Sequence, residues 1–350
     1  MQSWNEFDRT AWTRTALDHH VTNMTTYSLE RFTPVDHRGE GAATSYIAKT
    51  LRRASESPLF EIIPAEHHAS TLAALNWLDE PRVYRCGLAG EFPDGLRMPV
   101  VYHLDESPER ITIWMEDVSD HAAWDLDRYH RTAEVLGQLN GRWSATVAAE
   151  RFALGSRDVS ELFFGKVVNF DLPNQADDPF WEQPAISDAV DRQHRRDLFE
   201  LAQQIPSMLG VLATIPRGVC HGDATPGNFL EPGDGTIVAI DWAFGNIDAI
   251  GSDLAQLLAG RFESGDAAAG DLGAISSALC DGYRSGLSRA GVDIDAAQWQ
   301  YAWATHLAVR SVFSALMVEP AQDDRAMREL IRTRAALGRF GIDFARRVTM

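Results

Sequence analysis

The segment HGDATPGNFL at 221–230, followed by VAIDW at 238–242, limits the possible folds of this chain more than any other feature. Between the two motifs, two short apolar runs flank a Pro-Gly-Asp-Gly cluster, which predicts a β-hairpin with a tight turn. A hairpin brings the start of its first strand and the end of its second strand to the same edge. The pattern therefore predicts that Asn228 and Asp241 can share one cation, with Asp223 just upstream.

These residue types suit phosphoryl transfer. That reaction needs Mg²⁺ to neutralise phosphate charge, and a carboxylate that positions and deprotonates the attacking hydroxyl. Because Mg²⁺ takes hard oxygen ligands and needs only one or two from the protein, we predict Asn228 and Asp241 as metal ligands and Asp223 as the catalytic base. His221 is predicted to brace the loop. The alternative is an ordinary turn whose Asp and Asn side chains bond their own backbone, which leaves the joint spacing of motif and hairpin unexplained.

HGDATPGN and IDW resemble the catalytic loop and the metal-binding segment of the aminoglycoside phosphotransferase and choline kinase-like family, the small-molecule branch of the protein-kinase-like fold. The following IDAIGSDLAQLL is similar to the next segment of that family, in which Asp253 steadies the catalytic loop from a helix start. The resemblance covers most of positions 40–315 and is strongest after 205. It implies a two-lobed α+β fold, with a small antiparallel β-sheet lobe and a mostly helical lobe, and it implies ATP and Mg²⁺ as cofactors.

Protein kinases use related motifs but differ in detail. Their catalytic loop carries H-R-D, and D-F-G and A-P-E motifs follow it. This chain has Gly222 in place of the Arg and continues from Asp241 as DWAFGNIDAIGSDL. Regulation by phosphorylation of an activation loop is therefore not expected.

A kinase-like site also needs a lysine for the α- and β-phosphates. The chain has only two lysines, and Lys49, in the β-branched and aromatic run TSYIAKTL, is the better candidate. An exposed lysine at a strand edge is the alternative. Lys166 does not complete a Walker loop, because Ser160 and Val167 stand where Gly and Ser or Thr are required. The glycines of GEGAAT at 39–44 are predicted to form a turn over the phosphates.

The lysine needs a glutamate partner, and adenine needs a hinge. Glu80 is preferred narrowly over Glu66 as that partner, although Pro81 makes the choice awkward because proline is disfavoured inside a helix. The apolar strand ending in TIWMEDV has the character of a linker between lobes. The predicted adenine-binding hinge consists of Met115, Glu116 and Val118.

The chain is predicted to divide into a β-rich nucleotide-binding lobe at 1–118 and a helical lobe at 119–350 that carries the catalytic loop and the acceptor site. Short β-type runs (YSLERFTPV, TSYIAKTL, VVYHLDE and ITIWMEDV) occur before 118. Later segments carry apolar residues at three- and four-residue spacing and predict helices. Those segments span 126–143, 194–212, 272–291, 295–318 and 325–348. Pro and Gly concentrate in 153–187, which is predicted to be an irregular segment over the acceptor side.

Composition limits the partners. The 350 residues carry a net charge of −18, which argues against nucleic acid and anionic membranes and mildly favours a cationic acceptor. The sequence contains no apolar run of membrane-spanning length and no secretion signal at its start. The three cysteines are scattered, as free thiols of a cytoplasmic protein would be. The oligomeric state is left open.

These observations predict an ATP-dependent kinase that phosphorylates a hydroxyl of a small molecule. The resemblance favours slightly an aminoglycoside or related antibiotic as acceptor, and with it a role in antibiotic resistance. Two alternatives stay open: a sugar, choline-like or amino-alcohol kinase of primary metabolism, and an inactive nucleotide-binding protein that acts by interaction. The joint presence of Lys49, Asp223, Asn228 and Asp241 speaks against the inactive protein.

Overall fold

The computed structural model describes residues 12–17, 23–35, 45–317 and 325–348. By their internal contacts these fall into two compact units. The first takes in the described residues of Met1–Glu91, Arg97–His121 and Leu230–Ala243, and the second those of Phe92–Leu96, Ala122–Phe229 and Phe244–Met350. The hairpin that follows the Asp223 loop thus belongs largely to the first unit.

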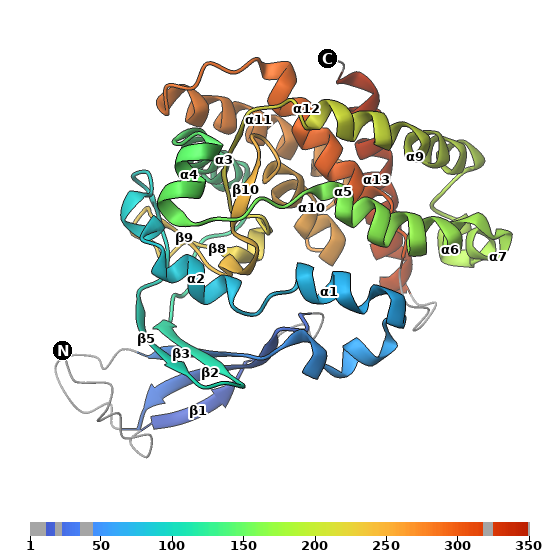
Figure 1. Ribbon diagram of the computed structural model, residues 1–350. Coiled ribbons are helices and arrows are strands. Elements are labelled where there is room, and N and C mark those ends of the chain that lie inside the picture. Colours follow the sequence, from blue (N-terminus) through green and yellow to red (C-terminus); the bar gives the residue numbers. More distant parts are fainter. Residues whose placement is uncertain (1–11, 18–22, 36–44, 318–324, 349–350) are drawn as a thin grey trace. The chain divides into compact units, whose positions relative to one another are not determined.

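The first unit is built on a five-stranded antiparallel sheet of order β1-β2-β3-β6-β5 (Figure 1). Its strands are β1 (Trp12–Ala16), β2 (Thr26–Pro34), β3 (Tyr46–Leu51), β5 (Val101–Glu106) and β6 (Ile111–Glu116). The four predicted strands are therefore confirmed. Successive side chains point to opposite faces of a strand. Ala48 accordingly packs with Phe32 and Trp114 on one face, while Leu51 packs with Ile113 on the other.

Short helices accompany this sheet. They are α1 (His68–Ala74), α2 (Asp79–Arg85), and the 3₁₀ turns η3 (Ala54–Glu56), η4 (Pro58–Ile62), η5 (Ala65–His67) and η6 (Leu88–Glu91). Pro81 lies in the first turn of α2, where its missing N–H has no helical partner to lose. Tyr84 of α2 packs against the sheet face that carries Leu51. The glutamate of this helix is thereby brought over the same face.

The predicted hairpin is confirmed. Its strands β8 (Phe229–Leu230) and β9 (Ile237–Ala239) form a three-stranded sheet with β4 (Leu96–Arg97), in the order β4-β9-β8. The turn between β8 and β9 uses Gly233 and Gly235 at φ of 91° and 82°, a region that favours glycine. Asp234 between them accepts a hydrogen bond from the Thr236 N–H at 2.9 Å.

The second unit is mostly helical. Its longer helices are α3 (Leu126–Gly141), α4 (Ala145–Phe152), α9 (Arg192–Leu212), α10 (Leu254–Ser264), α11 (Leu272–Arg289), α12 (Ala296–Leu307) and α13 (Arg325–Arg347). It also contains the antiparallel pair β7 (Arg217–Cys220) and β10 (Asn246–Ala249), the 3₁₀ turns η8 (Pro226–Asn228), η9 (Trp242–Phe244) and η10 (Ala269–Asp271), and the π-helical turn η11 (Ala308–Val312). The boundary of the two units falls within η9 and within the two-residue strands β4 and β8. The helices predicted from periodicity are confirmed, although the one at 295–318 turns into η11 after Leu307.

The prediction of an irregular segment at 153–187 is wrong for most of its length. From Val159 onward the chain forms α5 (Val159–Leu162), the π-helical η7 (Phe163–Asp171), α6 (Leu172–Ala176), α7 (Asp178–Glu182) and α8 (Pro184–Ser187). Pro173, Pro179 and Pro184 each stand at the first or second position of a helix. Proline is tolerated there, so these prolines mark helix starts rather than exclude helix.

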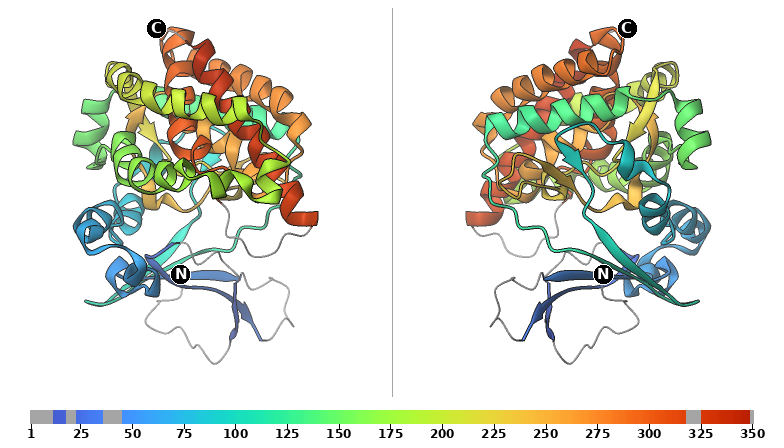
Figure 2. Two further views of the ribbon diagram at one scale, coloured as in Figure 1. Left: turned by 90° about the vertical axis from the view of Figure 1, so that its right-hand side faces the viewer. Right: turned by 90° about the vertical axis from the view of Figure 1, so that its left-hand side faces the viewer.

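Helices α3 and α11 pack unusually closely. A Cβ atom added at Gly282 would lie 2.1 Å from the His130 carbonyl oxygen, and one at Gly286 would lie 2.0 Å from that of Glu134. These glycines therefore let the two backbones touch. Helix α13 lies against α9, α10 and α12 (Figure 2). Ile205 of α9, Ala302 of α12 and Ile342 of α13 are buried in one hydrophobic core.

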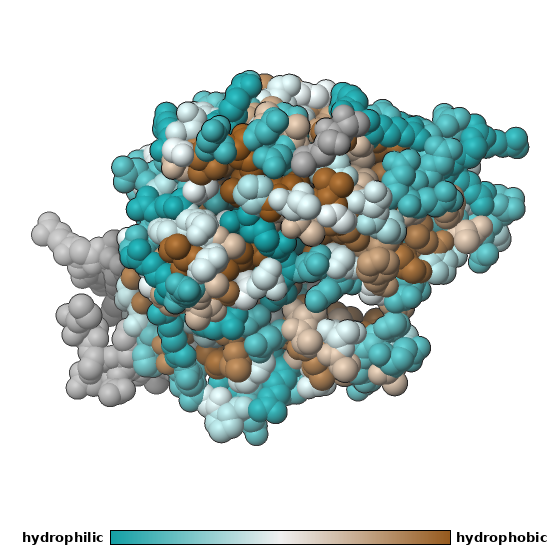
Figure 3. Space-filling model, turned by 45° about the horizontal axis from the view of Figure 1, so that its top comes forward, coloured by the Kyte–Doolittle hydropathy of each residue, from teal (hydrophilic) through white to brown (hydrophobic). Residues whose placement is uncertain are grey.

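On the face drawn in Figure 3, hydrophilic residues break up the apolar areas. Within the described ranges, no helix has both the length and the apolar character needed to cross a membrane.

Candidate active site

The loop that carries Asp223 follows β7, and its backbone is held by one carboxylate. Asp253, at the start of α10, is 2% exposed. Its Oδ2 accepts the N–H of His221 at 3.0 Å and its Oδ1 accepts the N–H of Gly222 at 3.0 Å. Gly222 has φ of 77°, and a Cβ there would lie 2.1 Å from the Phe244 carbonyl oxygen. Glycine in place of the protein-kinase Arg is thus required by the local backbone.

A buried amide network extends this support to α3 and α11. Asn140 Nδ2 donates to the Val219 carbonyl at 2.7 Å and to Asp253 Oδ2 at 3.1 Å. The Tyr283 hydroxyl donates to Asn140 Oδ1 at 2.7 Å. The sequence analysis did not identify Asn140. The only indication in the sequence is that this polar residue falls on the buried side of an amphipathic helix. The loop therefore rests on fully buried, hydrogen-bonded groups, which favours a single conformation.

His221 lies within the loop itself and is completely buried. Its Nδ1 accepts the N–H of Asp223 at 3.3 Å, and its ring stacks at a tilt on Phe229 with centroids 5.2 Å apart. These contacts join the ring to the loop, and its bracing role stays a prediction.

The Asp223 carboxylate is half-buried and accepts hydrogen bonds on both oxygens. Asn228 Nδ2 donates to Asp223 Oδ2 at 3.1 Å and to its carbonyl oxygen at 2.8 Å. Gln256 Nε2, from the first turn of α10, donates to Asp223 Oδ1 at 2.6 Å. Sequence reasoning missed Gln256. Its signal was the three-residue spacing from Asp253, which places both side chains on the same face of a helix.

In the first unit, Lys49 lies on the central strand β3 and is buried, which excludes an exposed strand-edge lysine. Its Nζ is 2.8 Å from Glu80 Oε2 and 2.8 Å from Asp241 Oδ1. Glu66, the other candidate partner, is exposed. Burial alone lowers the pKa of Lys49, but the carboxylates of Asp241 and Glu80 outweigh it and hold that pKa above its usual range. Lys49 is therefore a cation at neutral pH.

Asp241 has φ of 58°, a left-handed conformation that a non-glycine residue rarely adopts. Such strain costs about 1–3 kcal/mol and gathers at functional sites. Asp241 belongs to the first unit, whereas Asp223 and Asn228 belong to the second. Their convergence on one ion stays a prediction.

The predicted hinge lies at the end of β6. Met115 is buried, and the Glu116 side chain forms a bidentate ion pair with Arg97 at 2.6 and 2.8 Å. The Glu116 N–H donates to the Val100 carbonyl at 2.9 Å. The main chain of Val118 makes no hydrogen bond to the residues that the structure describes. The predicted phosphate turn at 39–44 lies outside those residues.

Comparison with known proteins decides the family. The model of the phosphotransferase enzyme family matches residues 51–290, which include Glu80, Asp223, Asn228 and Asp241. The chain belongs to this family. It is thus a phosphotransferase, as the motifs predicted, and Lys49 lies two residues before the matched region. A search of the curated proteins finds no match to the chain.

Solved structures agree on the fold of this phosphotransferase. An amicoumacin kinase in complex with AMP-PNP, Ca²⁺ and Ami is 13% identical, with a TM-score of 0.55 over 95% of this chain and 90% of that chain. The spectinomycin phosphotransferase APH(9)-Ia with ADP and spectinomycin is 12% identical, with a TM-score of 0.56 over 96% and 93%. An aminoglycoside phosphotransferase from Alicyclobacillus acidocaldarius is 16% identical, with a TM-score of 0.54 over 98% and 93%. The predicted protein-kinase-like fold is confirmed.

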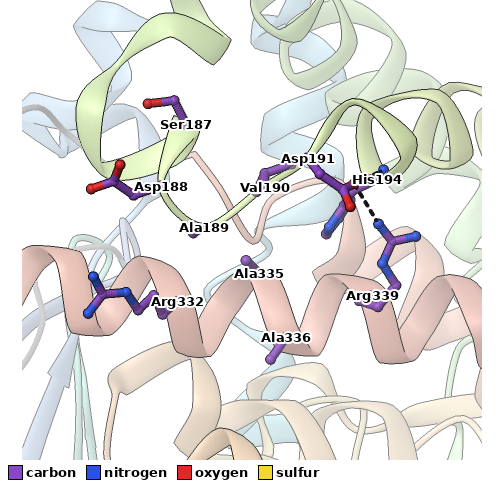
Figure 4. Close-up of a pocket in the computed structure, with 10 residues that line it drawn as sticks. All are labelled: Ser187, Asp188, Ala189, Val190, Asp191, His194, Arg332, Ala335, Ala336 and Arg339. Carbon is purple, nitrogen blue, oxygen red and sulfur yellow. Dashed lines mark hydrogen bonds and ion pairs between the residues drawn. The ribbon is translucent and has the colours of Figure 1, made fainter.

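The second unit of the phosphotransferase also has a hollow of about 450 Å³ beside α13 (Figure 4). Figure 4 shows Arg339 of α13 reaching Asp191 at the start of α9, and the contact measures 3.3 Å. Arg339 also pairs with Asp197 at 2.6 Å. None of the predicted site residues lines this hollow. The charge of Arg339, which does line it, is already neutralised by Asp191 and Asp197.

Proposed function

We propose that the protein is an ATP-dependent kinase that transfers the γ-phosphoryl group of Mg²⁺-ATP to a hydroxyl of a small molecule. The observation that carries this proposal is the state of the Asp223 carboxylate. Asn228 and Gln256 hold one oxygen each, and a carboxylate oxygen has two lone pairs. A held carboxylate with remaining acceptor capacity suits a general base that receives the hydroxyl proton.

Lys49 is proposed to bind the α- and β-phosphates, with Glu80 orienting it. This assignment rests on the buried ion pair at 2.8 Å and on the ammonium staying charged. The second carboxylate on Lys49, from Asp241, ties the lysine to the segment that follows the hairpin. The main chain of Met115, Glu116 and Val118 is proposed to meet adenine.

Asn228 and Asp241 are proposed to hold Mg²⁺, and the residues fit such an ion. The Asn228 amide nitrogen is committed to Asp223, which directs the amide oxygen to any other partner. Carboxylate and amide oxygens are ligands that Mg²⁺ accepts. When bound there, the metal would neutralise charge on the transferring phosphates.

The proposed acceptor is an aminoglycoside or a related antibiotic, which would give the enzyme a role in antibiotic resistance. The family resemblance favours this class, and the net charge of −18 would attract its amines. The free thiols of Cys86, Cys220 and Cys280 suit a reducing compartment, so we place the enzyme in the cytoplasm.

Thermal-shift measurements with Mg²⁺-ATP, followed by ADP-release assays, test the proposal. The acceptor panel would contain aminoglycosides, spectinomycin, choline, ethanolamine and simple sugars. We expect stabilisation by Mg²⁺-ATP and turnover of at least one acceptor. Stabilisation without turnover on any acceptor would favour a nucleotide-binding protein that acts by interaction.

The Asp223→Asn variant tests the base. It keeps the size of the side chain but removes the proton acceptor, so kcat should fall by about 10²–10⁴-fold. The Mg²⁺-ATP thermal shift should persist, because Lys49 is untouched. Undiminished turnover in this variant would show that Asp223 is not the base.

A further inference from the structure

The surroundings of Asp223 contain a second link that the reaction as described does not use. Gln256 Nε2 donates to Asp223 Oδ1 at 2.6 Å, and Gln256 Oε1 accepts from Arg310 Nη1 at 3.0 Å. All three residues belong to the second unit. We propose that Gln256 and Arg310 act as positioning residues: Arg310 orients the Gln256 amide, and the amide orients the Asp223 carboxylate. We call this chain of hydrogen bonds from Arg310 through Gln256 to Asp223 the relay. This inference rests on the proposed function of Asp223 as the base.

The chemistry of the three groups allows only one arrangement of the amide. A carboxylate only accepts hydrogen bonds and a guanidinium only donates them. The amide therefore satisfies both neighbours only with its NH₂ group toward Asp223 and its oxygen toward Arg310. If the amide turned over, its oxygen would face the carboxylate and its NH₂ group the guanidinium. Arg310 thus penalises the wrong orientation at the far end of the side chain.

The backbone places both residues for this task. Gln256 and Asp253 share the first turn of α10, so one turn holds the loop backbone through Asp253 and the carboxylate through Gln256. Arg310 lies on η11, a π-helical turn, and such turns occur often at functional sites. The wide turn interrupts α12 at the point where this arginine is presented to α10.

Neighbouring cations of the same unit have different partners. Lys166 pairs with Asp171 at 2.7 Å, and Arg334 donates to the Glu263 carbonyl at 2.7 Å. Among the described residues, Arg310 has no carboxylate partner, and its only hydrogen bond goes to the neutral Gln256. Within the described part of the chain, the contact that Arg310 makes is thus the one that orients the Gln256 amide.

The relay has a catalytic consequence. With Asn228 on Oδ2 and Gln256 on Oδ1, the plane of the carboxylate is set from both sides. A misplacement of about 1 Å in a reacting group can cost roughly 10²-fold in rate. Loss of the relay should therefore lower kcat while leaving the KM for Mg²⁺-ATP nearly unchanged.

Four variants test the relay kinetically, using the full-length enzyme with an acceptor that it turns over and with water as the acceptor. Gln256→Leu should lower kcat by about tenfold to a hundredfold, with the KM for Mg²⁺-ATP changed by less than about twofold. Arg310→Met should lower kcat by at least about threefold, and Arg310→Lys, which still donates, should recover most of that loss. The Gln256→Leu/Arg310→Met double variant should be no worse than Gln256→Leu alone, because residues that act in series are not additive. Additive losses, or an unchanged kcat in Gln256→Leu, would overturn the relay.

A measurement without turnover separates this inference from the proposed function. The side-chain amide signal of Gln256 in a ¹⁵N–¹H correlation spectrum is assigned by its loss in Gln256→Leu. The relay predicts that this signal shifts in both Asp223→Asn and Arg310→Met, but not in the control Arg284→Met, which removes an exposed arginine of α11 that pairs with Asp281. If the signal shifts in both variants but the enzyme turns over no acceptor, the relay is supported and the proposed kinase function is wrong. If the signal shifts in neither variant, the relay is wrong whatever the activity.

Discussion

The Lys49 ammonium group pairs with two carboxylates of the first unit, those of Glu80 and Asp241. Glu80 is 2% exposed, and burial raises its pKa to about 7 even beside Lys49, so removing the cation leaves a buried carboxyl group without its partner. Breaking such a pair costs about 3–5 kcal/mol. Lys49→Met should therefore lower both the free energy of unfolding, measured in urea, and the rate of phosphoryl transfer.

The Lys49→Met/Glu80→Gln double variant separates the two effects. It replaces the unpaired carboxyl group by a neutral amide, so most of the lost stability should return, whereas phosphoryl transfer should stay low because no ammonium meets the phosphates. If activity returned together with stability, Lys49 would be structural and its assignment as a phosphate ligand would be wrong.

The residues that the sequence identified here are those whose chemistry is tied to a motif. Asp223, Asn228, Asp241 and Asp253 lie at fixed spacings in one segment. Gln256 and Arg310 carry no motif, because their roles arise from contacts between helices that a linear pattern does not record. The sequence preferred Glu80 over Glu66 only narrowly, because the pairing depends on how α2 packs against β3, which the three-dimensional fold supplies.

At the scale of elements, the α3–α11 contact depends on glycine. A Cβ at Gly286 would lie 2.0 Å from the Glu134 carbonyl oxygen, and backbone cannot yield as a flexible side chain can. Gly286→Ala should therefore force the helices apart and lower the free energy of unfolding by about 3 kcal/mol or more. Because α3 also carries Asn140, which bonds Asp253, kcat should fall as well.

Gly273→Ala is the matched control on the same helix. A Cβ there meets nothing within 4 Å, so only the higher helix propensity of alanine should be felt, raising stability by about 0.5–1 kcal/mol. Urea unfolding of both variants decides the matter. Equal stability of Gly286→Ala and Gly273→Ala would show that the helices do not pack through Gly286.

Elements with strong periodicity or a turn cluster were predictable, as the hairpin of β8 and β9 and the helices α9 and α13 illustrate. The segment at 153–187 was not, because its prolines suggested an irregular chain, whereas each of them stands at a helix start. Its helices α5 and α6 continue through η7 without a break from Val159 to Ala176. Packing of Phe163 and Val167 into the core of the second unit is what stabilises them.

Ionisable groups set how the free energy of unfolding of the protein depends on pH. Burial, together with the positive charge of Arg339, lowers the pKa of His194 to about 4 against the opposing effect of nearby carboxylates. The two arginines that pair with Asp197, Arg346 first, hold the pKa of that carboxyl below its ordinary range. In both cases the unfolded chain binds a proton at a pH where the folded chain does not. The free energy of unfolding therefore rises with pH between the folded-state and unfolded-state pKa of each group.

The two groups act in different windows, which makes the His194 contribution measurable. Between pH 6.5 and about 4, the unfolded chain protonates this histidine while the folded chain keeps it neutral, at a cost of about 3 kcal/mol over the window. The Asp197 contribution is lost only below about pH 4. The free energy of unfolding, measured in urea at several pH values, should therefore fall from about pH 6.5 downward.

In His194→Gln this fall should shrink markedly between pH 6.5 and 4, whereas the His67→Gln control, at a half-buried histidine, should retain it. An unchanged slope in His194→Gln would mean that the histidine is solvated or already protonated in the folded enzyme.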